Sequence, residues 1–196
     1  MTRAVLLARY ARRRLRRLAG DERGVSAVEF AMLLPLMLSL YLGSVEISQG
    51  IGADRKVTLT ARSVADLVAQ VSSINNADMT NSLNAAGAVM APFPVVNLKV
   101  TVSSISIDAT GKATVAWSDT LNGTARATGS TVTLPAALKV ANTSLIWGEA
   151  QYTYKPTIGY VVSGTLTLKD QISMRPRLSN SVPRTAKTCS AAKIPR

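Results

Sequence analysis

The feature that most constrains this chain is an apolar run of 21 residues, Val25–Val45, which holds a single charge at Glu29. At ~1.5 Å per residue, a helix of this length spans roughly 30 Å, the thickness of a bilayer core. A buried helix of a soluble protein is rarely apolar on every face over such a length. The run therefore predicts one membrane-spanning helix near the N-terminus.

The charges on the two sides of this run predict its orientation. Residues 1–24 hold eight arginines against two carboxylates, whereas charges are sparse just beyond Val45. The positive-inside rule then places residues 1–24 in the cytoplasm and the chain from about residue 46 outside the bacterial inner membrane, in the periplasm. The arginines expected on the anionic inner leaflet are Arg12, Arg13, Arg14, Arg16, Arg17 and Arg23.

Two alternatives compete with a permanent membrane anchor and its basic leader. A cleaved secretory signal has an apolar region of only ~7–15 residues and a small-x-small cleavage site, and residues 43–48 make a poor site of that kind. An uncleaved signal anchor stays open. The basic leader could also bind nucleic acid by charge alone, but its interleaved leucines favour a membrane surface. We expect no nucleic-acid partner.

Glu29 is the residue of the apolar run that most needs an explanation, because a carboxylate inside a spanning segment is costly and usually has a partner. One reading is that it reaches the headgroups or Arg23. In the other reading, the chain is cut after Gly24, and the new α-amine of Val25 on a neighbouring subunit pairs with Glu29. Pro35, in mid-span, predicts a kink that shapes packing against neighbouring helices.

These residues carry a resemblance to known proteins. Gly24, followed after four residues by Glu29 and Phe30 at the start of an apolar helix, resembles the type IV prepilin class. The wider stretch to Glu46, with Val-Glu-Phe-Ala, the mid-helix proline and a closing Gly-x-x-Glu, resembles the TadE-like family, the minor pseudopilins and assembly proteins of the tight-adherence (Tad) pilus. Looser similarities lie at residues 65–70, 152–156 and 173–177.

The resemblance implies a function and a set of partners. It implies cleavage by a prepilin peptidase between Gly24 and Val25, with Glu29 and Phe30 completing the processing site, and an inter-subunit helix contact at Glu29 and Pro35. The chain would then be a minor pseudopilin or assembly component of a Tad-type (type IVc) pilus and secretion system. Its partners would be other pilin, pseudopilin and Tad assembly subunits. The alternative is a permanently anchored envelope protein whose periplasmic domain binds a ligand or a surface.

Beyond the membrane run, residues 46–75 predict an amphipathic helical stalk that ends near Asn75. Val57, Ala61, Val64 and other small apolar residues recur at three- and four-residue spacing. This stripe packs either under a small sheet or against partner subunits. Two glycines, at positions 50 and 52, predict a hinge, because glycine weakens helix interiors.

The rest of the chain predicts a second short helix and a mostly antiparallel sheet. A helix over residues 79–90 is capped by Asp78, and alternating residues 96–107 form a strand whose phase shift at Ile105 indicates a bulge. Residues 108–112 have hairpin-turn chemistry and lead into a returning strand at 113–117. Residues 118–131 predict an exposed loop, and residues 143–158 and 161–172 predict two further strands.

These elements predict an α+β protein with a small periplasmic sheet domain. The aromatic residues Trp147, Tyr152, Tyr154 and Tyr160 are expected in its core or on a sheet face, with a carbohydrate platform as the alternative. The tail from Ser179 is expected to be mobile. The chain divides into a leader 1–24, a transmembrane helix 25–45, a stalk 46–75, a domain 76–178 and a polar basic tail 179–196.

No residue pattern indicates catalysis. Histidine is absent, and Cys189 is the single cysteine, so the chain lacks the commonest general base and any thiolate zinc cluster. No phosphate loop or G-x-S-x-G motif occurs. We therefore expect no enzyme activity, cofactor, metal or small-molecule substrate. Cys189 is expected to be a free thiol in the tail, with an intermolecular disulfide as the alternative.

Overall fold

The computed structural model describes residues 24–156, 159 and 164–185. The chain forms two compact units, Met1–Val45 and Glu46–Arg196. The expectations for the leader arginines, Tyr160 and Cys189 lie outside the described residues.

The long helix α2 runs from Val25 to Ala69 without a break. The helix is thus unbroken at Gly50 and Gly52, and the hinge at these glycines stays a prediction. A Cβ built at Gly50 would lie 3.7 Å from Cε1 of Tyr154, and one at Gly52 would meet no atom within 4 Å. The helix also ends earlier than predicted, because the carbonyl of Ala69 accepts a hydrogen bond from the Arg177 amide at 2.9 Å.

The second helix, α3, spans Asn76–Met90. Asn75 is its N-cap, and the Asn75 side chain accepts a hydrogen bond from the Asp78 amide at 2.9 Å. Asp78 lies in the first turn, where a carboxylate interacts favourably with the helix dipole. The cap thus lies three residues before the one predicted. The buried residues Met79, Leu83, Ala86 and Met90 recur at helical spacing on one face.

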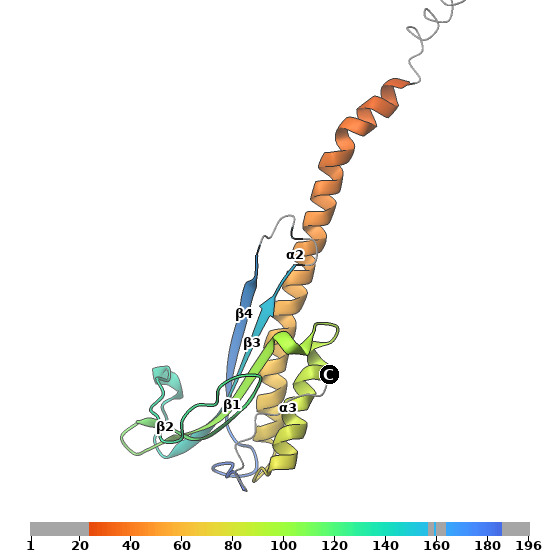
Figure 1. The fold of residues 1–196 in the computed structure, drawn as a ribbon. Coiled ribbons are helices and arrows are strands. Elements are labelled where there is room, and N and C mark those ends of the chain that lie inside the picture. The colour runs from red at the N-terminus through yellow and green to blue at the C-terminus, as the bar shows by residue number, and fades with distance from the viewer. Residues whose placement is uncertain (1–23, 157–158, 160–163, 186–196) are drawn as a thin grey trace, which may run out of the picture. The chain divides into compact units, whose positions relative to one another are not determined.

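Four antiparallel strands follow the helices: β1 (Leu98–Ile107), β2 (Ala113–Leu121), β3 (Thr143–Tyr154) and β4 (Leu166–Met174). They form one sheet in the order β2-β1-β3-β4 (Figure 1). The predicted α+β class, with an N-terminal apolar helix and a small antiparallel sheet, is confirmed.

The β1–β2 connection has the hairpin chemistry that the sequence predicted. The Asp108 carboxylate accepts hydrogen bonds from the Thr110 amide, the Thr110 hydroxyl and the Lys112 amide at 2.6–2.9 Å. These bonds, led by the one from the Thr110 hydroxyl, lower the pKa of Asp108 below its ordinary value. Gly111 has a φ of +80°, a conformation that glycine adopts without strain.

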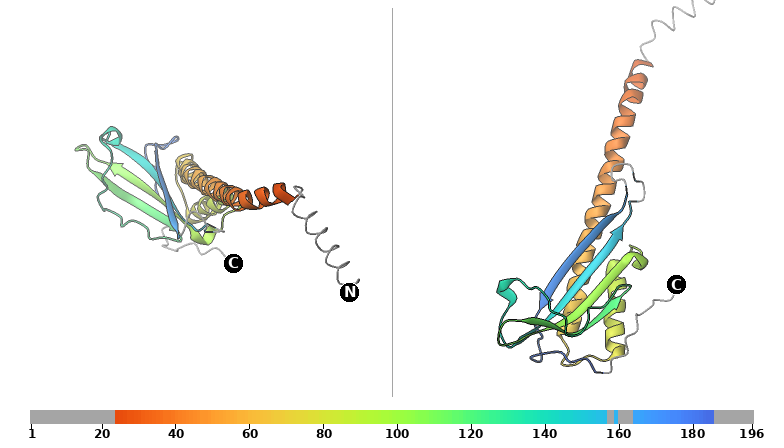
Figure 2. Two further views of the ribbon diagram at one scale, coloured as in Figure 1. Left: turned by 90° about the horizontal axis from the view of Figure 1, so that it is seen from above. Right: turned by 60° about the vertical axis from the view of Figure 1, so that its left-hand side comes forward.

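One face of the sheet packs against α3 and the part of α2 that follows Glu46 (Figures 1 and 2). The apolar stripe of the stalk lies in this core, and Val57, Val64 and Val68 are fully buried. Helix and sheet approach closely at Gly148, where an added Cβ would stand 2.7 Å from the Ala61 carbonyl oxygen. The expectation that the stripe packs under a sheet is confirmed.

The opposite face of the sheet has a smaller apolar cluster of its own. Along β1 the buried apolar residues first face the helices and then, at Ile105 and Ile107, face the other side. The predicted bulge occurs at this point, but the extra residue belongs to β2: Ser104 pairs with Trp117 and Ile105 with Val115. The cluster is covered by the segment before β3. Its remaining members are Ala113, Val115, Leu134, Leu145 and Trp147, with Val132 and Leu138 packed against them.

Two expectations about loops differ from the structure. The loop predicted at 118–131 begins later, because β2 continues to Leu121. Residues 179–185 of the tail, expected to be mobile, pack against the domain. The Val182 carbonyl accepts a hydrogen bond from Trp117 Nε1 at 2.7 Å, and Arg184 Nε lies 2.9 Å from Asp119 Oδ2. Backbone and charge partners anchor this polar segment, and apolar patterning does not reveal them.

Candidate functional site

The predicted processing site lies at the very start of α2. Val25 is the first residue of the helix, Gly24 directly precedes it, and Glu29 and Phe30 follow in the second turn. A cut between Gly24 and Val25 would therefore leave an α-amine on the first helical residue. Glu29 lies four residues along the same helix, which is slightly more than one turn.

The fold itself does not require a glycine at position 24. A Cβ built on Gly24 would meet no atom of the described chain within 4 Å, and its φ lies outside the left-handed region. This differs from Gly148, where a Cβ would overlap the Ala61 carbonyl oxygen. A requirement for glycine at position 24 would thus come from something other than the packing of this chain.

Glu29 and its neighbours present their side chains outward. Glu29 is exposed and has no hydrogen-bond or ion-pair partner among the described residues. Val28 and Phe30 are 60% and 57% exposed, values that leave their apolar surface uncovered within this chain. The alternative partner, Arg23, lies outside the described residues.

Pro35 lies inside α2, where it removes one backbone hydrogen bond of the helix. The Ser39 hydroxyl donates a hydrogen bond to the Pro35 carbonyl oxygen at 2.7 Å. Around these residues an 18-residue window has a mean hydropathy of 1.9, and none of it is buried in the structure. Among the described residues α2 is the one helix that is long and apolar enough to cross a membrane.

Two of the segments with looser family resemblance meet in the second unit. The Arg177 guanidinium forms an ion pair with the Asp66 carboxylate, and the Arg177 amide donates to the Ala69 carbonyl. The third segment contributes Tyr152 and Tyr154, both buried, which contact the Phe93 ring edge-on at centroid distances of 6.0 and 6.3 Å. These segments therefore hold the end of α2 and the core together.

Among the described residues, Trp147, Tyr152 and Tyr154 do not form an exposed platform for carbohydrate. Trp147 is 8% exposed and belongs to the outer apolar cluster, where the Arg126 guanidinium lies 5.4 Å from the ring centroid. Arg126 also forms a bidentate ion pair with Glu149, with Nη2–Oε distances of 2.7 and 2.8 Å. The expectation of a core role for Trp147, Tyr152 and Tyr154 is confirmed.

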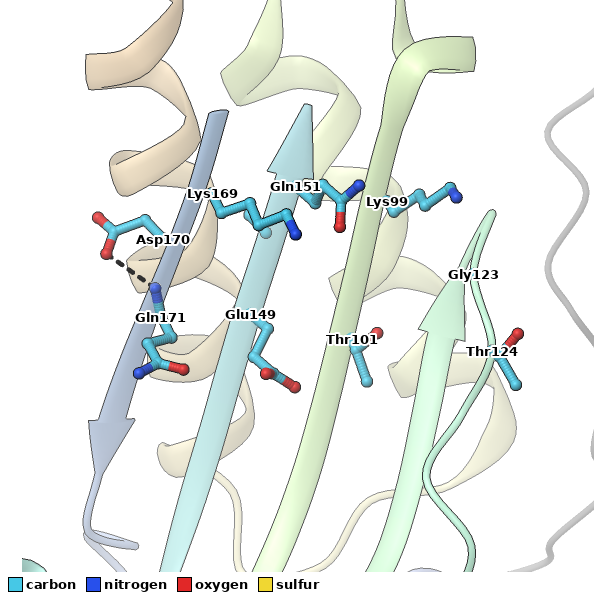
Figure 3. A pocket seen from close by; sticks show the side chains of 10 residues that line it. Lys99, Thr101, Gly123, Thr124, Glu149, Gln151, Lys169, Asp170 and Gln171 are labelled. Carbon is cyan, nitrogen blue, oxygen red and sulfur yellow. Dashed lines mark hydrogen bonds between the residues drawn. The ribbon is translucent and has the colours of Figure 1, made fainter. Parts of the chain in front are cut away.

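A hollow of about 500 Å³ lies on the sheet face turned away from the helices (Figure 3). Lys99, Gln151 and Lys169 line it in one row across β1, β3 and β4. A smaller hollow of about 110 Å³, lined by Trp147, Leu134 and Ser173 among others, lies further along β4. The sequence did not reveal either hollow, because the lining side chains alternate with core residues on separate strands.

Comparison with models of protein families gave a match in the N-terminal part of the chain. The family model described as TadE-like protein matches residues 24–66, which include the predicted processing site, all of the apolar run and most of the remaining length of α2. Comparison with curated proteins and with solved structures gave no match. Residues 24–66 are thus similar to the TadE-like proteins that this part of the sequence resembles.

Proposed function

We propose that this protein is a minor pseudopilin or assembly component of a Tad-type pilus and secretion system. The observation that carries the proposal is the arrangement at the start of α2. Gly24 precedes the first helical residue, and Glu29, which is exposed and has no partner among the described residues, follows one turn later. The TadE-like match over residues 24–66 supports it. The proposal assigns the chain no catalytic activity.

The proposed orientation places the leader in the cytoplasm and the unit from Glu46 onward in the periplasm. It rests on the eight arginines of residues 1–24 and on the positive-inside rule. The spanning segment then lies in the inner membrane with its apolar side chains facing lipid or neighbouring helices. This orientation puts Gly24 at the cytoplasmic face of the membrane, next to the basic leader.

Cleavage after Gly24 would add an unfavourable α-amine to a helix that already carries the unfavourable carboxylate of Glu29, and the two charges can neutralise each other between subunits. An α-amine at a helix N-terminus is repelled by the helix dipole, and a carboxylate within an apolar segment loses its hydration. Pairing the Val25 amine of one subunit with Glu29 of its neighbour relieves both. Because the two groups lie about one turn apart along α2, the pair sets the axial offset between adjacent helices.

Mass spectrometry of the mature N-terminus tests the processing step. In cells with the cognate prepilin peptidase, we expect a chain that begins at Val25, and in cells without it a chain that keeps its leader. Gly24→Val should block cleavage and leave the fold intact, because the site has room for a side chain. Gly52→Ala, an equally open position in the same helix, is the matched control and should be cleaved normally.

Exchange of the Glu29 carboxylate tests the pairing step separately. Glu29→Ala should impair assembly while cleavage stays largely intact, since the glycine before the cut is unchanged. Asp54→Asn, which removes another exposed carboxylate of α2, should assemble as the natural chain does. Equal assembly by Glu29→Ala would remove the pairing role.

The rival function is a permanently anchored envelope protein that binds a ligand or surface, and the 500 Å³ hollow on the outer sheet face favours it. A mature N-terminus at Met1 or Thr2 in peptidase-positive cells would exclude the processed pseudopilin and leave this rival.

A further inference from the structure

The 500 Å³ hollow on the outer sheet face holds a row of three polar side chains. Lys99 on β1 pairs with Gln151 on β3, and Gln151 pairs with Lys169 on β4, so the row crosses three neighbouring strands. All three residues line the hollow, and Figure 3 shows their side chains in one line. None of the three side chains has a hydrogen-bond or ion-pair partner among the described residues. The row therefore presents two free ammonium groups and a free amide to the hollow.

The alternation of the strands explains why this row faces the hollow. In each strand a residue next to the row belongs to the core on the helix side or packs against it: Leu98, Tyr152 and Leu168. Successive side chains of a strand point to opposite faces, so the row points to the outer face. Neighbouring strands lie about 4.8 Å apart, which separates the Cα atoms of Lys99 and Lys169 by roughly 10 Å. Both long lysine side chains can thus reach one ligand group above Gln151.

The two carboxylates nearest the row do not neutralise its lysines. Both oxygens of Glu149 accept hydrogen bonds from the Arg126 guanidinium, at 2.7–3.2 Å. Asp170 follows Lys169 in β4 and so belongs to the other face, and its Oδ1 accepts a hydrogen bond from the Gln171 amide at 2.7 Å. Figure 3 shows the Asp170 carboxylate on the far side of β4 from the Lys169 ammonium. Two positive charges of the hollow are left without a counter-charge in the described chain.

The number and kind of these groups define the anion that fits them. A phosphate monoester carries close to two negative charges near pH 7 and has three strong acceptor oxygens. It matches two ammonium groups and the NH₂ group of Gln151. A carboxylate or a sulfate ester carries one charge and would leave one lysine without a counter-charge. Lysine also binds phosphate as a point charge, whereas paired recognition of carboxylates favours arginine.

The remaining lining of the hollow is polar and leaves room for more than a phosphate group. Apart from Gly123 and Ala150, every residue that lines it has a polar side chain. The side chains of Thr124 and Gln171 are among them, and neither has a partner among the described residues. A hydroxyl and an amide can each donate and accept hydrogen bonds, as the hydroxyls of a sugar do. The rest of the ligand should therefore be rich in hydroxyl groups.

We propose that the hollow binds the phosphate monoester of a polyhydroxy ligand, such as a phosphorylated sugar. The phosphate lies above Gln151 between the ammonium groups of Lys99 and Lys169, and the hydroxyl groups of the ligand contact Thr124 and Gln171. The ligand is either a soluble compound or the headgroup of a lipid, because both can carry this chemistry. The site holds the ligand and performs no reaction on it.

This inference goes beyond the proposed function and concerns only the second unit. It does not require cleavage after Gly24 or pairing of Glu29, so either proposal can fail while the other stands.

Isothermal titration calorimetry tests the site with the full-length protein in nanodiscs of phosphatidylcholine. The probe is glucose 6-phosphate, and the matched control is glucose 6-sulfate, which has a similar shape and one charge fewer. The control should bind at least tenfold more weakly. Lowering the pH from 7.5 to 5 should weaken binding of the probe about tenfold, because the phosphate takes up its second proton near pH 6 while the lysines stay charged.

Substitutions in the row test which residues hold the phosphate. Gln151→Glu places a carboxylate of nearly the same size between the two lysines and should abolish binding of glucose 6-phosphate. Lys99→Met and Lys169→Met should each weaken it at least tenfold. Lys112→Met changes an exposed lysine at the other end of β1 and should bind as the natural chain does. Melting temperatures should stay close to the natural value in all four variants, because these side chains lie outside the core.

A competition experiment separates the two sources of the ligand. Glucose 6-phosphate is titrated into protein in nanodiscs that contain phosphatidylinositol 4-phosphate or, as the control, phosphatidylinositol. Loss of the titration only with the phosphorylated lipid supports the site and assigns it to a lipid headgroup. An equal titration in both supports the site and assigns it to a soluble ligand.

Three results would overturn the proposal. The first is no detectable binding of glucose 6-phosphate or of inorganic phosphate by the natural chain. The second is equal binding of glucose 6-phosphate and glucose 6-sulfate. The third is undiminished binding by a folded Gln151→Glu variant, because the phosphate would then lie outside the row.

Discussion

The two parts of α2 differ in how far their apolar side chains are covered. Between Val25 and Leu40 its apolar side chains are exposed, as at Met32 with 76% and Leu40 with 67%. Between Ala53 and Ala69 the apolar side chains on one face are completely buried. Both parts are helical and rich in apolar residues, yet within the described residues only the second part has its apolar side chains covered.

The difference lies in how the apolar residues are arranged. In the second part they recur at three- and four-residue spacing with polar residues between them, so one face can pack on a sheet while the others stay in water. In the first part they surround the helix, and no single packed face could cover them. Such a segment needs lipid or the helices of other subunits around it.

Two substitutions that introduce a charge, one in each part of α2, should have the largest effects. Val64→Asp buries an unpaired carboxylate in the core of the second unit and should lower its free energy of unfolding by about 4 kcal/mol or more. Leu34→Arg should leave that free energy unchanged, but it should disfavour membrane insertion by roughly 3 kcal/mol at mid-span. Urea denaturation and membrane fractionation measure the two effects.

The result that would contradict this division is a Leu34→Arg variant that unfolds at lower urea while it remains fully membrane-bound. Such a result would show that the second unit, and not the membrane, covers the apolar side chains around Leu34.

The close contact between helix and sheet at Gly148 should be nearly as sensitive. Gly148→Leu forces a side chain against the Ala61 carbonyl and the Ala65 Cβ and should destabilise the second unit by roughly 3 kcal/mol. Gly52→Ala has open space and should be neutral or slightly stabilising, because alanine favours helix over glycine. Thermal unfolding of both variants gives the comparison, and equal melting temperatures would refute the close packing.

The anchored tail should contribute a smaller but measurable part of the stability. Arg184→Leu leaves the Asp119 carboxylate without its partner, and the side chains of this pair are only 5% and 14% exposed. We expect a loss of about 2–3 kcal/mol. Arg126→Leu breaks the pair with Glu149, whose side chains are 35% and 28% exposed, and should cost about 1 kcal/mol or less. Urea denaturation of the two variants should preserve this order.

A small effect on stability is expected for Tyr154, the last residue of β3. The Tyr154 hydroxyl is buried without a hydrogen-bond partner among the residues that the structure describes, and Tyr154→Phe should raise stability by about 1 kcal/mol. Burial, and then the charges of Glu46 and Tyr152, raise the pKa of Tyr154 above 10.0. The free energy of unfolding is therefore unaffected by ionisation of Tyr154 below pH 10. It falls as the pH rises further, because the tyrosine ionises more readily in the unfolded chain. Denaturation at pH 7 and pH 11 should show a steeper loss for the natural chain than for the variant.

Much of the fold was predictable because its signals are local. The helix cap near Asp78, the hairpin at Asp108 and the alternation of β1 depend on residues a few positions apart. The candidate processing site was predictable for the same reason, since Gly24 and Glu29 lie within two turns of one helix. The helix continues through Gly50, because glycine lowers helix propensity without breaking a helix that packs against a sheet.

The sequence by itself thus determined the membrane-length helix, the order of elements and the TadE-like N-terminal segment, because each follows from spacing along the chain. Only the tertiary structure decided that Gly148 lies under α2, that Arg184 anchors the tail, and that Lys99 and Lys169 flank Gln151. These features join residues far apart in sequence, and their partners are fixed by how the strands stack and pair.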